Sequence, residues 1–105
     1  MNGYFDIALN LASDRFLGDR EKVITNAISH NVNFFNIVCS SIDELDFVKD
    51  LNSRFRENSC FTLGVHPHNA NELNEDNLQS LKDSIKMHHP SAVGETGLDF
   101  FRNLS

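Results

Sequence analysis

Side chains able to hold a metal ion or a phosphate gather in two short stretches of this chain. His66 and His68 flank Pro67 directly after an apolar run, and Glu95 and Asp99 lie on either side of a glycine near the end of the sequence. Carboxylates and imidazoles in such places are typical of divalent-metal hydrolysis, in which the metal lowers the pKa of water and polarises a phosphoryl or carbonyl oxygen. The sequence contains no phosphate-cradling glycine motif and no nucleophile elbow, which disfavours nucleotide-cofactor and covalent chemistry.

The two stretches each allow a simpler explanation. In an extended segment, His66 and His68 point to the same side and can share one metal or one phosphate, whereas a turn begun at Pro67 would leave both rings in solvent. Glu95 ends a predicted buried strand, where its carboxylate must be paired, metal-bound or protonated. A plain ion pair with Arg102 or with a lysine would also satisfy it. Asp99 suits either a site or an ordinary capped turn.

Strand-like and helix-like segments alternate along the chain. We expect strands at 5–9, 33–39, 60–65 and 91–95, and helices at 19–30, 43–51 and 74–87. This alternation is typical of parallel (βα) repeats with right-handed crossovers, in a single α/β domain over residues 1–105. Four units make either an open doubly wound sheet or half of an eight-stranded barrel. In both, the carboxyl ends of the strands share one edge, so we expect Asp6, His66 and Glu95 to cluster there.

Composition excludes some classes of protein. The chain of 105 residues carries a formal net charge of −6, which argues against a broad electrostatic footprint on nucleic acid or on an anionic membrane, though not against an enzyme that grips one strand end. No apolar run reaches the length of a membrane span, and no secretory signal is visible, so a cytoplasmic location is expected. Cys39 and Cys60 would lie at opposite ends of the sheet and are expected to be free thiols.

With these motifs in place, the sequence resembles the TatD-type metal-dependent deoxyribonucleases, a family of amidohydrolase-like TIM barrels. The segments that carry the match are 5–11 (FDIALNL), 64–68 (GVHPH) and 93–100 (VGETGLDF). The resemblance spans essentially the whole chain but only the first two-fifths of a complete member. It implies the N-terminal half of a TIM barrel, with about four strands, from a parent enzyme that trims DNA from its 3′ ends with a divalent ion.

The resemblance also implies roles for individual residues. Glu95 would be a metal ligand, with Mg²⁺ favoured over Mn²⁺ or Zn²⁺. Ala8 and Asn10 stand where many members have two metal-binding histidines, which weakens a second metal position. The residues implied to contact substrate or shape the mouth of the site are His66, His68, Asn10, Asp99 and Arg102, with Asp6 on the first strand beside them.

The resemblance leaves most of the family's metal ligands without a counterpart, so we expect this chain to be inactive alone. Two alternatives remain open. The chain can be a truncated, non-catalytic piece that serves in assembly, associating with itself through uncovered sheet edges. Its parent can also be a different metal hydrolase of the same superfamily, cleaving an amide or an ester.

Overall fold

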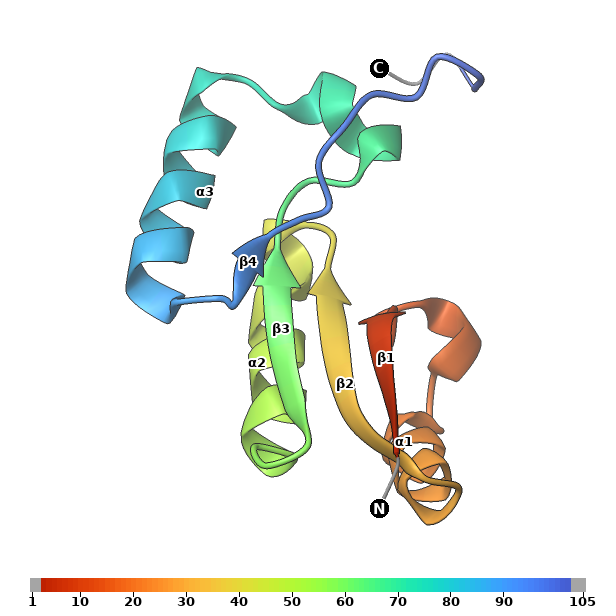
Figure 1. Ribbon diagram of the computed structural model, residues 1–105. Helices are drawn as coiled ribbons and strands as arrows, with labels where there is room; N and C mark the ends of the chain where they lie inside the picture. Colours follow the sequence, from red (N-terminus) through yellow and green to blue (C-terminus); the bar gives the residue numbers. More distant parts are fainter. Residues whose placement is uncertain (1–2, 103–105) are drawn as a thin grey trace.

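The computed structural model describes residues 3–102 as a parallel β-sheet with helices in the connections (Figure 1). The strands are β1 (Tyr4–Leu9), β2 (Val32–Cys39), β3 (Ser59–Leu63) and β4 (Ala92–Val93), in the order β1-β2-β3-β4. Every neighbouring pair is parallel. The sheet curls into a half-barrel, which confirms the predicted parallel (βα) architecture.

Helices fill each connection between strands. Their bounds are α1 (Arg20–Ser29), α2 (Leu45–Arg54) and α3 (Glu75–His88), with short 3-10 turns η1 (Asp14–Phe16), η2 (Ile42–Glu44) and η3 (Pro67–Glu72). The three predicted helices are therefore confirmed within a few residues at their ends. Each 3-10 turn follows the carboxyl end of a strand, where the sequence leaves helical spacing and the chain must change direction.

Alternation along β2 creates the core between the sheet and its helices. Phe35, Ile37 and Cys39 are each at most 1% exposed, because successive strand residues point to opposite faces and these three share the helix-facing one. They pack with apolar residues of α1, α2, α3, β3 and the loop after β1, which are Ile24, Leu45, Val48, Leu51, Leu81, Phe61, Leu63 and Leu11. This layer holds the strands in position for the polar groups beyond their ends.

Both cysteines are free, as predicted. Cys39 pairs with Leu63 at one end of the β2–β3 ladder, while Cys60 pairs with Asn36 nearer the other end. Burial raises the pKa of the Cys39 thiol to about 11, so this side chain behaves as a small apolar group in the core rather than as a nucleophile.

The fourth strand is shorter than expected. It covers Ala92–Val93 instead of 91–95, because its partner β3 ends at Leu63 and no ladder continues beyond that point. One further backbone bond, from the Gly94 N–H to the Leu63 carbonyl, closes the pairing. The chain then leaves the sheet and passes across the end of β3 (Figure 1).

The outer strands leave apolar side chains uncovered. Ile7 and Tyr4 on β1 are 74% and 71% exposed, and Val93 on β4 is 54% exposed. Unpaired edges of this kind can add further strands. The predicted self-association through sheet edges therefore has a structural basis and stays a prediction. Within residues 3–102, no helix has the length and apolar character to cross a bilayer.

The core layer yields a stability prediction. Phe35→Ala should lower the free energy of unfolding by about 3–5 kcal/mol, because it empties a fully buried site in the central strand. Phe101→Ala, at a side chain that is 93% exposed, should change it by less than about 0.5 kcal/mol. Urea unfolding followed by circular dichroism measures both. Equal effects of the two substitutions would contradict the assignment of the core.

The uncovered edge yields a second prediction. Sedimentation velocity over a range of concentrations should show association of this chain, and Ile7→Lys should weaken it about tenfold or more, because a lysine on an edge strand opposes pairing and the isoleucine no longer becomes buried. Leu17→Lys is the matched control, since Leu17 is 72% exposed but lies in a loop. A wild-type chain that stays monomeric, or equal effects of both lysines, would exclude edge pairing.

Candidate functional site

Backbone pairing beyond the ends of β2 and β3 positions the first histidine. The Gly64 N–H donates to the Cys39 carbonyl, and the His66 N–H donates to the Ser40 carbonyl at 3.1 Å. The ladder thus continues past the strands that its residues define. It fixes the backbone of His66 at the carboxyl edge of the sheet, which is where the sequence placed it.

The two histidines come together by a turn and not by an extended strand. His66 precedes η3 as its N-cap residue, and Pro67 opens that turn. The imidazole rings of His66 and His68 pack edge to face with centroids 4.3 Å apart. The extended conformation that motivated the pairing is therefore wrong. The alternative is confirmed in its turn at Pro67 but wrong in leaving both rings in solvent. The rings nevertheless meet, with side chains 28% and 41% exposed.

One hydrogen bond decides the tautomer of neutral His66. The backbone N–H of His68 donates to the Nδ1 atom of His66 at 3.0 Å, so Nδ1 must carry a lone pair. The proton of the neutral ring then resides on Nε2, which faces Glu95 with 3.7 Å between Nε2 and Oε1. That separation allows an electrostatic contact but exceeds a hydrogen bond. Neutral His66 therefore presents its N–H donor toward the Glu95 carboxylate.

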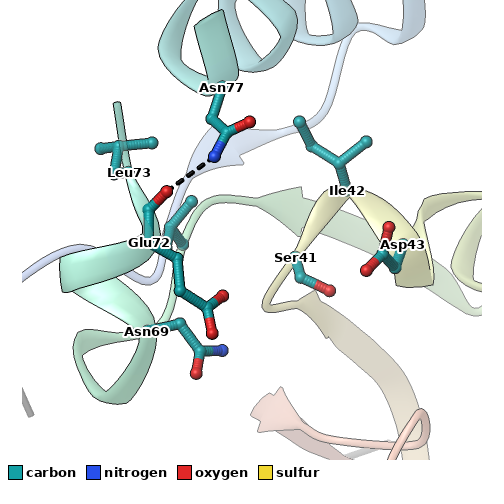
Figure 2. Close-up of a pocket in the computed structure, with 8 residues that line it drawn as sticks. Ser41, Ile42, Asp43, Asn69, Glu72, Leu73 and Asn77 are labelled. Atoms are coloured by element: carbon teal, nitrogen blue, oxygen red, sulfur yellow. Dashed lines mark hydrogen bonds between the residues drawn. The ribbon is translucent and has the colours of Figure 1, made fainter. Parts of the chain in front are cut away.

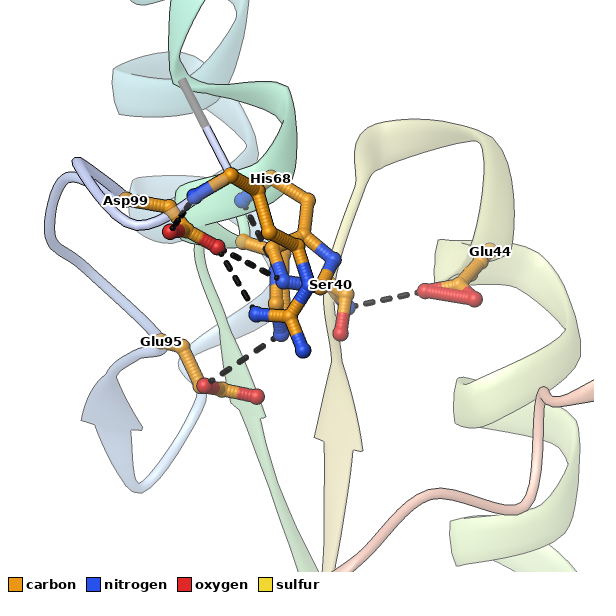
Figure 3. Close-up of polar contacts among 7 residues, drawn as sticks. Ser40, Glu44, His68, Glu95 and Asp99 are labelled. Carbon is orange, nitrogen blue, oxygen red and sulfur yellow. Dashed lines mark hydrogen bonds and ion pairs between the residues drawn. The ribbon is translucent and has the colours of Figure 1, made fainter. Parts of the chain in front are cut away.

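The polar residues at the carboxyl edge of the sheet form one cluster, which consists of His66, His68, Glu95, Asp99 and Arg102 (Figure 3). Asp99 binds two of the other members. Its Oδ2 atom lies 3.0 Å from both the Nε2 of His68 and the Nη1 of Arg102, and its Oδ1 accepts from the Arg102 N–H at 2.9 Å. The backbone hydrogen bond from Arg102, followed by its guanidinium and by His68, holds the pKa of Asp99 below its ordinary value despite desolvation. With its side chain only 10% exposed, Asp99 stays ionised and orients His68.

Glu95 is more open than the sequence suggested. Its side chain is 49% exposed, so the expectation of a buried carboxylate at the end of a strand is wrong. The alternative of an ion pair with Arg102 is wrong as well, because Arg102 pairs with Asp99 and the neighbour of Glu95 is His66. The early end of β4 explains the exposure, since the two-residue strand releases the chain before Glu95 is reached.

Close packing of the backbone depends on a glycine that sequence reasoning did not single out. A Cβ atom at Gly64 would collide with the carbonyl groups of Gly94 and Glu95, whereas one at Gly94 would meet open space. The absence of a side chain at Gly64 is what lets the segment that carries Glu95 cross the end of β3. The signal was present in the sequence as a glycine inside an apolar strand.

Asp6 does not join the cluster. It pairs with Phe35, which in turn pairs with Ser59 at the first position of β3. The rise from Ser59 to the end of β3 is roughly 13 Å, and His66 lies further on. The prediction that Asp6 meets His66 and Glu95 is therefore wrong. The register of strand pairing, and not the order of residues along the chain, determines how far a side chain lies from the carboxyl edge of the sheet. The Asp6 carboxylate instead accepts from the nearby N–H of Ala8 at 3.1 Å.

Asn10 follows the carboxyl end of β1, as expected, but stands apart from the histidines. Its carbonyl accepts from the Ser13 N–H at the start of the loop toward η1. Within residues 3–102, no hydrogen bond or ion pair links its exposed side chain to the cluster. Its role in substrate contact stays a prediction.

The end of β2 supplies two polar residues that the sequence analysis did not assign to the site (Figure 3). The Glu44 carboxylate accepts from the Ser40 N–H at 2.8 Å, which braces the turn whose carbonyl receives the His66 N–H. Glu44 lies in η2, which leads into α2, so this carboxylate ties the start of the helical segment to the end of β2.

A pocket of about 150 Å³ lies next to the cluster, between η2 and η3 (Figure 2). It contains none of the predicted site residues, although Val65 and Asn69 connect it to the histidine turn. Asp43 and Glu72 contribute carboxylates to its wall, and the Glu72 carbonyl accepts from the Asn77 amide at 2.6 Å. Two acidic groups make this pocket a poor site for a phosphate.

Comparison with known proteins shows the family to which the chain belongs. The family model described as TatD related DNase matches residues 5–105. The chain belongs to this family. Relatives named 3′-5′ ssDNA/RNA exonuclease TatD occur in Pantoea ananatis at 39% identity, in Dickeya dadantii at 35% and in Citrobacter koseri at 32%. Each alignment covers 96% of this chain but only 38–39% of the relative, so the chain spans about two-fifths of their length.

The part of the chain that the structure describes provides an incomplete donor set for a metal ion. Among residues 3–102, no three or more histidine, cysteine, aspartate or glutamate side chains are arranged to hold a metal ion. A catalytic site normally needs about three protein ligands. The Asp99 carboxylate is engaged by Arg102 and His68, which leaves the exposed Glu95 as the most available ligand in the cluster.

The Asp99 network yields a pH prediction. Arg102→Ala should raise the pKa of Asp99 only part of the way to its ordinary value of 3.8, because the backbone N–H at position 102 remains. A carbon-detected NMR titration of the carboxyl group measures this shift. Because the pKa is lowered in the folded chain, these contacts stabilise the loop above pH 3.8 and are lost as the pH falls through the lowered value.

Arg15→Ala is the control for that titration, since Arg15 lies in η1 on another part of the chain. An unchanged Asp99 pKa in the Arg102→Ala variant would show that the guanidinium contact is absent in solution.

Proposed function

We propose that this chain is the substrate-gripping part of a divalent-metal phosphodiester hydrolase that acts on single-stranded DNA from its 3′ end. The observation that carries this proposal is the convergence of His66, His68 and Glu95 at the carboxyl edge of a parallel sheet. Membership in the TatD related DNase family and the printed names of the relatives support the same chemistry. A cytoplasmic location accords with it and stays a prediction.

The proposed role of the imidazoles is to bind phosphate. The bond that the His68 N–H makes to Nδ1 leaves the proton of neutral His66 on Nε2, which lies on the side of Glu95. His68 is oriented by the Asp99 carboxylate, which also supports the positive charge of this ring when it is protonated. An oxygen of a phosphodiester placed beside His66 would receive a hydrogen bond without any rearrangement of these two rings.

The proposed role of Glu95 is to provide one ligand for a divalent ion, with Mg²⁺ favoured because it prefers carboxylate oxygens. Such an ion supplies Lewis acidity at a phosphoryl oxygen. The remaining ligands must come from residues other than those described, since these form no donor group of sufficient size. The isolated chain is accordingly proposed to lack hydrolytic activity.

A chimera tests the proposal. Residues 1–105 of this chain should replace the matching segment of the Pantoea ananatis relative, so that the relative supplies the rest of its own length. The stepwise shortening of a 5′-labelled single-stranded DNA is then measured with Mg²⁺ and with EDTA. The chimera should be active only with the metal. Glu95→Gln should lower kcat/KM by at least about a hundredfold, because loss of even an indirect metal support costs about ten- to a hundredfold.

Glu75→Gln provides the matched control, because Glu75 is an exposed residue in the first turn of α3. Full metal-dependent activity in the Glu95→Gln chimera would overturn the assignment of the ligand. Activity on small amide or ester substrates in place of DNA would favour the different metal hydrolase. An inactive chimera that is correctly folded would favour a non-catalytic role in assembly.

A further inference from the structure

One arginine at the start of α1 holds the loop that follows β1. The Nε–H of Arg20 donates to the Leu11 carbonyl at 2.6 Å, and its Nη2 atom lies 3.4 Å from the carbonyl oxygens of both Ala12 and Ser13. Three successive carbonyl groups of the loop therefore converge on one guanidinium. The loop leaves the carboxyl end of β1, at the edge of the sheet that also carries the candidate site, and returns to α1 (Figure 1).

A second contact fixes the guanidinium itself. Its Cζ atom lies 4.3 Å from the centroid of the Phe47 ring on α2, within the range of a favourable cation–π contact. Arg20 thus links the loop after β1 to two helices, and it is only partly exposed. The planar fork of an arginine can bind several carbonyls and stack on a ring at once, whereas the single ammonium of a lysine cannot.

The stability of α1 does not explain this arginine. Arg20 is the first residue of the helix, where a positive charge opposes the helix dipole. The loop, in contrast, needs the arginine. Leu11 is 0% exposed, so its carbonyl is shielded from solvent and needs a donor inside the protein. The guanidinium supplies that donor.

The position of Asn10 depends on the same loop. Asn10 directly precedes Leu11, its side chain is exposed, and its carbonyl accepts from the Ser13 N–H at 3.3 Å. Arg20 binds the carbonyls of both Leu11 and Ser13. The contacts of one guanidinium therefore determine where the Asn10 amide lies relative to the end of β1.

We propose that Arg20 is a positioning residue for the proposed reaction, which holds Asn10 at the carboxyl edge of the sheet for contact with the substrate. This inference rests on the proposed function and adds to it a residue that acts through the loop and does not touch the substrate. The role depends on the forked geometry of the guanidinium and not on its charge, so a lysine at position 20 should not replace it.

A double-mutant cycle in the chimera tests this role, with the shortening of 5′-labelled single-stranded DNA in Mg²⁺ as the assay. Arg20→Lys and Asn10→Ala should each lower kcat/KM by about tenfold or more, because a displaced or missing substrate contact is costly. The double variant should lose no more than the weaker of the two single variants, because Arg20 acts through Asn10. An arginine that serves stability alone would give losses that multiply.

Two further variants locate the effect. Arg15→Lys is the matched control, because Arg15 is exposed in η1, and it should leave kcat/KM unchanged. Phe47→Leu removes the ring on which the guanidinium stacks and leaves the loop sequence intact. Its loss should also fail to multiply with that of Asn10→Ala. Circular dichroism reports whether each variant is folded, and Phe47→Leu carries the test if Arg20→Lys is not.

A measurement on the 105-residue chain does not depend on hydrolysis. In ¹H–¹⁵N NMR spectra, Arg20→Lys should shift the side-chain amide signals of Asn10, because the backbone next to this residue is no longer held in place. Arg15→Lys should leave these signals where they are.

The outcomes separate this inference from the proposed function. Losses that multiply in an active chimera, or Asn10 signals that Arg20→Lys leaves unchanged, would overturn the role of Arg20 while the proposed function stands. A folded chimera that is inactive before any substitution would overturn the proposed function, and Arg20 would then hold the loop for stability alone.

Discussion

The structure depends on the pairing of β2 with β3 and on its continuation past both strands. Parallel strands reach the same edge of a sheet, but only backbone bonds beyond that edge determine where a loop residue lies. Here the His66 N–H reaches the Ser40 carbonyl, and Glu44 braces the turn from the other side. That anchor places His66 where its ring meets the ring of His68 and faces Glu95.

Helices cover one face of the sheet, whereas its outer edges and the segment near residue 100 are uncovered. The helix-facing side chains of β2 and β3 are buried by α1 and α2, which makes the base of the site rigid. The outer edges and the aromatic segment near residue 100 have no such cover within the described part of the chain. The molecule therefore combines a well-packed layer with uncovered surfaces where substrate or further polypeptide can bind.

Electrostatics within the cluster are local. Asp99 is kept ionised by its bonds to Arg102 and His68, and it orients these two donors. Because both partners face its carboxylate, Asp99 contributes little repulsion toward a phosphate. Within residues 3–102, Glu95 contacts His66 weakly and stays available to a cation. This region of an acidic chain therefore combines the hydrogen-bond donors of Arg102 and His66 with one exposed carboxylate, that of Glu95.

Much of this arrangement was predictable from the amino-acid sequence. Hydrophobic periodicity determined the four strands and three helices, because a period of two or of 3.6 residues reflects which face becomes buried. The positions of His66, His68, Glu95 and Asp99 after strands determined that they share one edge, and their motifs identified the family. Tertiary structure alone decided the rest. The register placed Asp6 below the rim, the early end of β4 exposed Glu95, and the turn at Pro67 paired the rings. These features arise from the relative height of neighbouring strands and from contacts across the fold, neither of which leaves a period in the sequence.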